Sequence, residues 1–263
     1  MKLSIGIANY HQLKHLERIL KNLDNCNLNI HELILLNNGK DKDFEKIIMP
    51  YLGKYNTIIL ENETNVGLIK SYNQLWQKCT GDWLAFLHND IIIYEEKWDE
   101  KIEKAIKKSN HPIGVVGFAG AVGIDRGGCR MGFASNLKAN AEGHGKRRTT
   151  PFPCVIVEGA VLICNMQMLN YVGGFFDYGS YHYVYDYDIS LSSIKGGFYN
   201  LIVPVSFDHL SGGTYATKEY VQEFPKTAEI NDEAWWHWND RWRNTAFIPL
   251  RIKEDWTYEK ASA

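Results

Sequence analysis

The sequence has little of what marks several classes of protein. Its 263 residues include five cysteines, none of them in a C-x-x-C pair, and its formal net charge is only −2. An odd number of scattered cysteines favours reduced thiols over a disulfide framework or a zinc site, so we expect a cytoplasmic protein. The near balance of charge gives no general electrostatic reason to bind nucleic acid.

Long apolar runs are missing as well. No stretch approaches the roughly 20 apolar residues that a membrane-spanning helix requires. The first residues, MKLSIGIANYHQ, become polar too early for a secretory signal peptide. We therefore expect at most a peripheral contact with the cytoplasmic face of a membrane.

What the chain does have is an alternation of strand and helix patterns through residues 1–116. Apolar segments typical of strands end in polar residues: KLSIGIAN, HELILLNN, NTIILEN and DWLAFLHND. Amphipathic helical segments such as HLERILKNLDNC and LIKSYNQLWQKC lie between them. This order predicts an α/β protein with a Rossmann-like, mostly parallel central sheet flanked by helices. In such sheets, ligands bind at the carboxyl ends of the strands.

The chain changes character after residue 116. Residues 117–153 are rich in glycine and small polar residues, and so long a connection is usually functional or disordered. A strand or strand–turn (CVIVEGAVLICN), two helices and a final strand (YNLIVPVSFDHLSGG) follow. Residues 215–263 predict an aromatic-rich helical extension. Trp235, Trp238 and Trp242 share one face of its helix, and we favour packing against the domain over a membrane interface.

The segment DWLAFLHNDIIIYEEKW contains a carboxylate between two apolar runs. Such a charge costs several kcal/mol when buried unless a partner compensates it. Asp90 therefore needs a partner, and a metal ion is one candidate. A turn cap after the strand is the alternative interpretation.

An ordered series of segments resembles the family 2 glycosyltransferases of the GT-A fold. The segments are SIGIANYH, LILLNNG, ENETNVGLIKSYNQ, GDWLAFLHND, VEGAVLICN, GGFFDYGSYHYVYDYDISL and FDHLSGGT, and they span residues 3–214. The resemblance implies a GT-A domain over residues 1–214, with a nucleotide-sugar half of about 1–116 and an acceptor half of about 117–214. It also implies a transferase of class EC 2.4 that moves a hexosyl or deoxyhexosyl group. The donor would be a nucleotide diphosphate-sugar and the acceptor a hydroxyl of a glycan or glycolipid in polysaccharide biosynthesis.

The resemblance further implies a divalent metal, Mn²⁺ or Mg²⁺, that bridges the diphosphate. His88-Asn89-Asp90 stands where the family has a D-x-D motif, so Asp90 is the expected metal ligand. His88 replaces the first aspartate of that motif, which leaves open whether a metal is required. His209, after the last core strand, is expected to complete the site, and an imidazole ligand suits Mn²⁺ better than Mg²⁺.

The same resemblance assigns a set of residues to the nucleotide-sugar. They are Asn9, Asn37, Asn38, Asn65, Gly67, Asn73, His88, Asn89 and Asp90. An aspartate is usual where this chain has Asn37, and an amide donates as well as accepts hydrogen bonds. The base therefore stays open among uracil, guanine and thymine, and the donor among UDP, GDP and TDP sugars. Asn-Asn-Gly is also simply a good turn sequence.

Asp186 matches the aspartate of the family's Glu-Asp pair, where this chain has Tyr185 in place of the glutamate. It is the expected base that takes the proton of the acceptor hydroxyl in an inverting transfer. Asp188 is expected to hold the acceptor or the loop, or to be the base itself. Both aspartates would also suit the start of a helix. The acceptor is expected to contact Glu158, Gly159 and His182.

Two other interpretations stay open. In one, the GT-A fold uses a metal-independent or retaining mechanism, as His88 in place of aspartate suggests. In the other, the chain is a catalytically degenerate GT-A module that binds a nucleotide or glycan without turnover.

Overall fold

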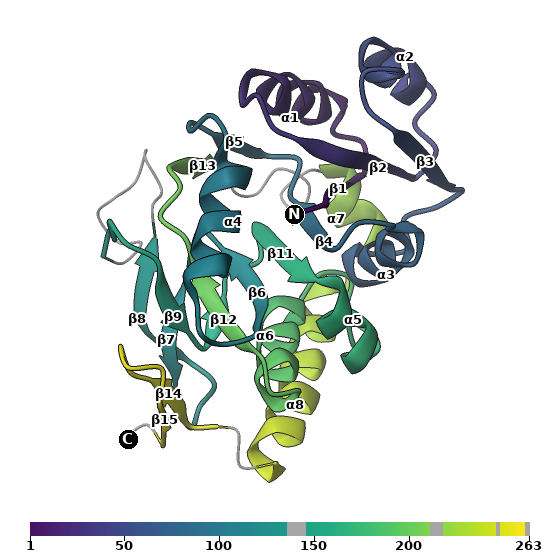
Figure 1. Ribbon diagram of the computed structural model, residues 1–263. Coiled ribbons are helices and arrows are strands. Elements are labelled where there is room, and N and C mark those ends of the chain that lie inside the picture. The colour runs from purple at the N-terminus through teal and green to yellow at the C-terminus, as the bar shows by residue number, and fades with distance from the viewer. Residues whose placement is uncertain (136–145, 211–217, 246–247, 261–263) are drawn as a thin grey trace.

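The computed structural model describes residues 1–135, 146–210, 218–245 and 248–260. Its centre is a sheet with the strand order β3-β2-β1-β4-β11-β6-β12-β9, with helices packed around it (Figure 1). The strands are β1 (Leu3–Asn9), β2 (Ile30–Asn38), β3 (Thr57–Asn62), β4 (Trp83–Leu87), β6 (Ile113–Gly117), β9 (Phe152–Cys154), β11 (Val161–Asn165) and β12 (Tyr199–Ile202). All run parallel except β11 and β9, which pair antiparallel with their neighbours.

Helices cover both faces of this sheet. Leu16 of α1 (Leu13–Asn25), Phe44 of α2 (Phe44–Ile48) and Trp98 of α4 (Trp98–Lys108) are buried in one core with one face. Residues of α3 (Leu68–Lys78), α5 (Met166–Val172) and α6 (Tyr185–Lys195) are buried in a second core on the other face. A short 3₁₀ helix, η1 (Met49–Tyr51), follows α2. Successive side chains of each strand point to opposite faces of the sheet, so the strands contribute apolar side chains to both hydrophobic layers.

The strand order reverses next to β1. The chain goes from β1 to β2 and β3 on one side, and then returns to place β4 on the other side of β1. In open α/β sheets, ligands bind in the crevice at this kind of switch point, outside the carboxyl ends of the strands. Asn9, Asn38 and the residues after Leu87 all lie at that edge.

The long connection expected over residues 117–153 contains strands of a second, smaller sheet. In it, β7 (Ala119–Ile124) pairs with β8 (Arg130–Ser135), β10 (Ile156–Val157) and β14 (Leu250–Ile252), and β14 pairs with β15 (Tyr258–Glu259). The sequence predicts one glycine-punctuated strand over residues 114–123, where the structure has β6 and most of β7. The small residues of β8 hid its strand pattern. The segment 136–145 lies outside the described residues.

A two-stranded ladder explains the apolar run that follows Asp90. In β5 (Ile91–Ile93), Ile91 and Ile93 are buried, and the strand pairs antiparallel with β13 (Phe207–His209). His209 lies opposite Ile91 in this register, and the backbone N–H of Leu210 donates to the Asp90 carbonyl. The ladder therefore brings the end of the last core segment beside Asp90.

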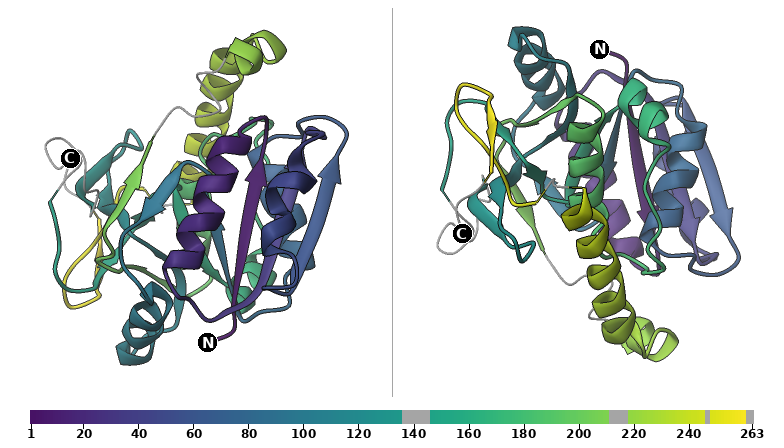
Figure 2. Two further views of the ribbon diagram at one scale, coloured as in Figure 1. Left: turned by 90° about the horizontal axis from the view of Figure 1, so that it is seen from above. Right: turned by 90° about the horizontal axis from the view of Figure 1, so that it is seen from below.

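The tryptophan-rich helix packs on the domain, as the spacing of its tryptophans predicts. In α8 (Thr227–Asn244), Trp238 and Trp242 are fully buried, and the Trp235 ring stacks on Trp238 at 4.9 Å between centroids. Figure 2 shows this helix beside α6, with the short α7 (Lys218–Glu223) projecting beyond its N-terminal end. In the part of the chain that the structure describes, no helix is long and apolar enough to cross a bilayer.

Candidate active site at the carboxyl edge of the sheet

A cavity of about 270 Å³ opens at the carboxyl ends of β1, β2 and β4. Nine of the residues predicted for the site line it: Asn9, Asn38, Asn65, Gly67, His88, Asn89, Asp90, His182 and His209. Tyr10, Tyr181 and Tyr220 contribute aromatic walls. The sheet edge predicted to bind a ligand is therefore hollowed, and its polar groups come mainly from amides and imidazoles.

His88, Asp90 and His209 form a cluster on one wall of this cavity. One ligand atom of each lies within 4.8 Å of the others. His209 Nε2 is 3.3 Å and His88 Nδ1 is 3.9 Å from the same oxygen, Asp90 Oδ1. Asp90 is 6% exposed, so the question raised by its place in the sequence has an answer: its buried charge faces two imidazoles.

The charges of this cluster are interdependent. Burial alone would raise the pKa of Asp90, but the hydrogen bond from His209 and the charges of both histidines lower that pKa to about 2. Burial and the neighbouring His209 lower the pKa of His88 to about 4. The pKa of His209 is raised in spite of burial, because Asp90 accepts its hydrogen bond and Glu158 adds negative charge. Near pH 7, His88 is neutral and Asp90 is an anion.

The His88 ring is held from its far side by Tyr185. His88 Nε2 is 2.8 Å from the Tyr185 hydroxyl, which leaves Nδ1 facing Asp90. Gly159 makes room for this contact, because a Cβ at position 159 would overlap the Tyr185 hydroxyl. The predicted acceptor residue Gly159 thus supports the cluster by having no side chain.

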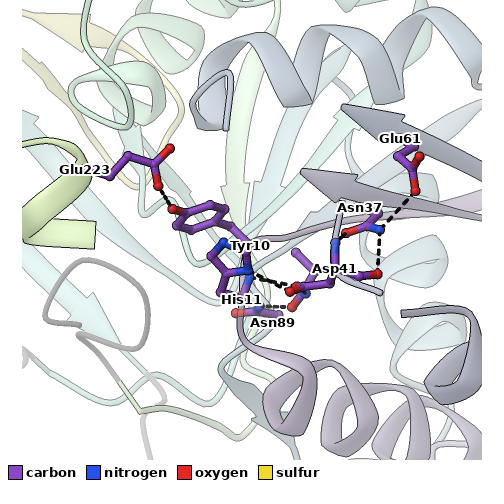
Figure 3. Close-up of polar contacts among 8 residues, drawn as sticks. Tyr10, His11, Asn37, Asp41, Glu61, Asn89 and Glu223 are labelled. Carbon is purple, nitrogen blue, oxygen red and sulfur yellow. Dashed lines mark hydrogen bonds and ion pairs between the residues drawn. The ribbon is translucent and has the colours of Figure 1, made fainter. Parts of the chain in front are cut away.

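Asp41 organises the polar network on the β1 and β2 side of the cavity (Figure 3). Its carboxylate accepts hydrogen bonds from the His11 backbone N–H at 3.0 Å and from the Asn9 side chain at 3.4 Å. The Asp41 backbone N–H donates to the Asn37 side-chain oxygen at 2.9 Å, and the Asn37 side-chain amide donates to the Glu61 carboxylate at 3.3 Å. Asn37 is therefore engaged in holding the Asp41 loop and lies outside the cavity lining.

Asn38 and Asn65 shape the entrance to α3. Asn38 Nδ2 donates to Asn65 Oδ1 at 2.7 Å, and Asn65 Oδ1 also accepts from the Gly67 backbone N–H at 2.9 Å. Gly67 has φ +85° and precedes the helix, and a Cβ there would meet the Tyr181 backbone at 3.0–3.1 Å. The Leu68 N–H donates to the Tyr181 carbonyl, so the loop before α6 docks on this helix start.

Asp186 lies on the acceptor side of the cluster, at the start of α6. Burial raises its pKa to about 6, Arg130 opposes that shift and Glu158 adds to it. Glu158 also raises the pKa of His209. The negative charge of this predicted acceptor residue therefore acts both on the cluster and on Asp186. Neither Glu158 nor Asp186 lines the cavity.

Asp188 and Asn73 point elsewhere. Asp188 is 2% exposed and accepts hydrogen bonds from Tyr178 at 2.5 Å and from the Trp242 indole at 2.8 Å. Asn73 exchanges two hydrogen bonds of 2.9 Å with the backbone of Phe175. Both side chains tie segments of the fold together rather than face the cavity.

The sequence comparison decides the family. The model of Glycosyl transferase family 2 matches residues 4–154, more than half of the chain. The chain belongs to this family. A search of curated protein sequences found no match to this family 2 chain.

Solved structures share the GT-A fold of this family 2 chain at low sequence identity. S. aureus TarS 1–349 aligns with a TM-score of 0.58 and 16% identity, over 78% of this chain and 58% of TarS 1–349. GalNAc-T7, solved with UDP, GalNAc and Mn²⁺, has a TM-score of 0.56 and 16% identity, over 87% of this chain and 48% of its own. Mannosyltransferase PcManGT from Pyrobaculum calidifontis, in complex with GDP-Man and Mn²⁺, has a TM-score of 0.55 and 14% identity, over 93% of this chain and 73% of its own. The chain thus spans about half the length of the first two, and the likeness shows the fold alone.

The cluster in this family 2 chain fits a divalent cation. Its donor atoms are two imidazole nitrogens and one ionised carboxylate oxygen that lie close enough to share an ion. Such a mixed nitrogen and oxygen set suits Mn²⁺ better than Mg²⁺, which prefers oxygen ligands. The residues that would hold it are His88, Asp90 and His209.

Several residues near the site of this family 2 chain were not predicted from its sequence. Tyr10 hydrogen bonds to Glu223 on α7, and the Tyr220 hydroxyl is 3.2 Å from His182 Nδ1 (the first pair in Figure 3). Asp41 was missed as well, although its place just after a strand-end turn was a usable signal. No local signal in the sequence indicates that α7 returns to the end of β1.

Proposed function

We propose that this chain is a metal-assisted, inverting glycosyltransferase that moves a sugar from a nucleoside diphosphate-sugar to a hydroxyl of an acceptor. One observation carries the proposal. His88 and Asp90 follow β4, His209 ends β13, and their side chains converge on the wall of a cavity at the switch point of the sheet. A site of that kind, with a cation between sheet edge and ligand, suits a diphosphate.

The donor half of the cavity would hold the nucleoside. Asn9, Asn38 and Asn89 are buried at its wall, and amide groups both donate and accept hydrogen bonds. Structures of the same fold contain UDP-GlcNAc (TarS), UDP (GalNAc-T7) or GDP-Man (PcManGT), which supports a nucleotide-sugar without choosing its base.

The protein's own residues would carry the transfer as follows. Positive charge from Mn²⁺ or Mg²⁺ bound by the cluster would stabilise the departing nucleoside diphosphate. Asp186, as the base, would take the proton from the acceptor hydroxyl as that oxygen attacks the anomeric carbon from the face opposite the diphosphate. The raised pKa of about 6 supports this role, since it increases the proton affinity while leaving the carboxylate ionised at pH 7.5. Asp188, buried against Trp242, would position α6 instead.

The acceptor and the cellular setting have a narrower basis. The charge of Glu158 acts on Asp186, and His182 contacts the Tyr220 hydroxyl. We propose Glu158 and His182 as acceptor contacts. A glycan or glycolipid of polysaccharide biosynthesis as acceptor, and a cytoplasmic location, rest on the sequence resemblance and composition.

Thermal unfolding with nucleotides tests the donor site. We expect one of UDP, GDP or TDP to raise the unfolding midpoint with Mn²⁺ and much less with EDTA, because a ligand at 100 times its dissociation constant adds about 2.7 kcal/mol to the native state. Asp90→Ala should abolish the metal-dependent part of the shift. The exposed Asp43 supplies the control, Asp43→Ala, which should keep it. An unmoved midpoint with every nucleotide would contradict the donor site, and nucleotide binding without release of nucleoside diphosphate from any sugar donor would point to a binding module.

A further inference from the structure

Two positions at which this chain departs from the family's motifs contact each other. His88 stands in place of the first aspartate of the D-x-D motif, and Tyr185 in place of the glutamate beside Asp186. They are 97 residues apart, and His88 Nε2 lies 2.8 Å from the Tyr185 hydroxyl. A carboxylate at each of these positions would place two like charges in contact, whereas imidazole and phenol form a neutral hydrogen bond.

The hydrogen bond determines which nitrogen of His88 faces the cluster. With Nε2 at the tyrosine, Nδ1 is the atom directed to Asp90, at 3.9 Å from Oδ1. A neutral imidazole that ligates a cation through Nδ1 carries its proton on Nε2, and that N–H then donates to the Tyr185 oxygen. Tyr185 thus has the position of a partner that orients a metal-binding histidine, and its hydroxyl can accept the Nε2–H that such a ligand carries.

The surroundings of Tyr185 hold its hydroxyl in place. The side chain is 6% exposed, and its ring packs edge-on against Tyr72 with centroids 5.6 Å apart. Val184, just before it, has φ 56°, a left-handed conformation that a β-branched residue rarely adopts. Gly159 leaves the space that the hydroxyl occupies. The strained backbone of Val184 and the missing Cβ of Gly159 both indicate that the surrounding structure fixes the position of the Tyr185 hydroxyl.

We propose that Tyr185 is a positioning residue that orients His88 as a ligand of the divalent cation, so that the His88–Tyr185 pair does the work of the missing motif aspartate. This inference rests on the proposed function, because it requires a cation in the cluster. Since Tyr185 directly precedes Asp186, the pair also links the metal side of the site to the segment that carries the base.

Manganese affinity of the whole protein tests the inference, measured by the electron paramagnetic resonance signal of free Mn²⁺. Tyr185→Phe removes only the hydroxyl and should weaken Mn²⁺ binding by about tenfold or more, the usual effect of losing an outer-shell partner. Tyr72→Phe is the matched control. Its hydroxyl is buried in the same aromatic group and has no hydrogen-bond partner among the described residues, so the affinity should stay unchanged.

The ring nitrogen of His88 that binds the cation gives a second measurement. In ¹⁵N-histidine-labelled protein titrated with diamagnetic Zn²⁺, two-bond ¹H–¹⁵N correlations should show ligation through Nδ1 of His88 with the proton kept on Nε2, and Tyr185→Phe should weaken that ligation while Tyr72→Phe keeps it. Ligation of the cation through Nε2 of His88 in the unmodified protein, or equal Mn²⁺ affinities of Tyr185→Phe and the unmodified protein, would overturn this inference alone. Failure of the unmodified protein to bind Mn²⁺ with or without nucleotide would contradict metal assistance in the proposed function and overturn the inference with it.

Discussion

Asp186 is the side chain whose chemistry depends most on its surroundings. Burial raises its pKa to about 6, with Arg130 and Glu158 acting in opposite directions. If it is the base, kcat/KM should fall about tenfold per pH unit below pH 6, because protonated Asp186 cannot accept the acceptor's proton. Asp186→Asn should lower kcat by about 100-fold or more with little change in nucleotide binding. Near-normal turnover by Asp186→Asn, measured across pH 5–8, would exclude it as the base.

Because the raised pKa of Asp186 means that its charge destabilises the folded state, we expect a neutral side chain at this position to raise the free energy of unfolding. The folded-state pKa of Asp186 lies above its ordinary value of 3.8, so its contribution to stability is present below that value and is lost as pH rises through about 6. Asp186→Asn should therefore raise the free energy of unfolding at pH 8, by up to about 3 kcal/mol. The gain should disappear by pH 4. Denaturant unfolding at the two pH values measures it, and a gain that is equal at both would contradict the assigned pKa.

How far the sequence predicts single residues depends on how local their partners are. Asp90 and His209 could be placed at strand ends from hydrophobic pattern and resemblance, and the structure brings them together. Asn37 could not be distinguished from a ligand-facing residue, since its partner Glu61 becomes a neighbour only when β2 and β3 pair. The contact of His88 with Tyr185 was equally hidden, because it joins segments 97 residues apart.

At the scale of elements, α6 depends on α8 through one buried carboxylate. Asp188 accepts hydrogen bonds from Trp242 and Tyr178, and Arg241 lies 3.6 Å away. Asp188→Ala should lower the free energy of unfolding by about 3 kcal/mol, because buried donors lose their acceptor. Asp188→Asn keeps an acceptor oxygen and should cost less. Chemical denaturation compares the two, and equal stability of Asp188→Ala and the unmodified protein would contradict the anchoring role.

Elements with strong periodicity were predictable, and those stabilised by distant pairing were not. Leu16, Ile19, Leu20 and Leu23 mark α1 by their spacing, and all four are buried. By contrast, half of the residues in β8 are small and carry little strand preference by themselves. This segment is a strand because it pairs with β7, in a sheet that β10 and β14, distant in sequence, complete.

For the whole molecule, the C-terminal region is part of the hydrophobic core. Trp238 and Trp242 of α8 and Ile252 of β14 are buried in one cluster with Ile156 and Leu191. A chain ending at residue 217 should uncover this cluster and lose cooperative thermal unfolding, even though the resemblance covers only residues 3–214. Trp242→Ala in the full chain should cost about 3–5 kcal/mol. A soluble, cooperatively melting chain of residues 1–217 would show that the extension is separable.

The contact between Gly159 and Tyr185 also limits how this site can vary through evolution. Because any Cβ at position 159 would overlap the Tyr185 hydroxyl, position 159 cannot gain a side chain while Tyr185 is kept. Among close homologues, residues larger than glycine at 159 should occur together with side chains shorter than tyrosine at 185. Such correlated substitution would mark the boundary between chains that pair an imidazole with a phenol and chains that retain two carboxylates.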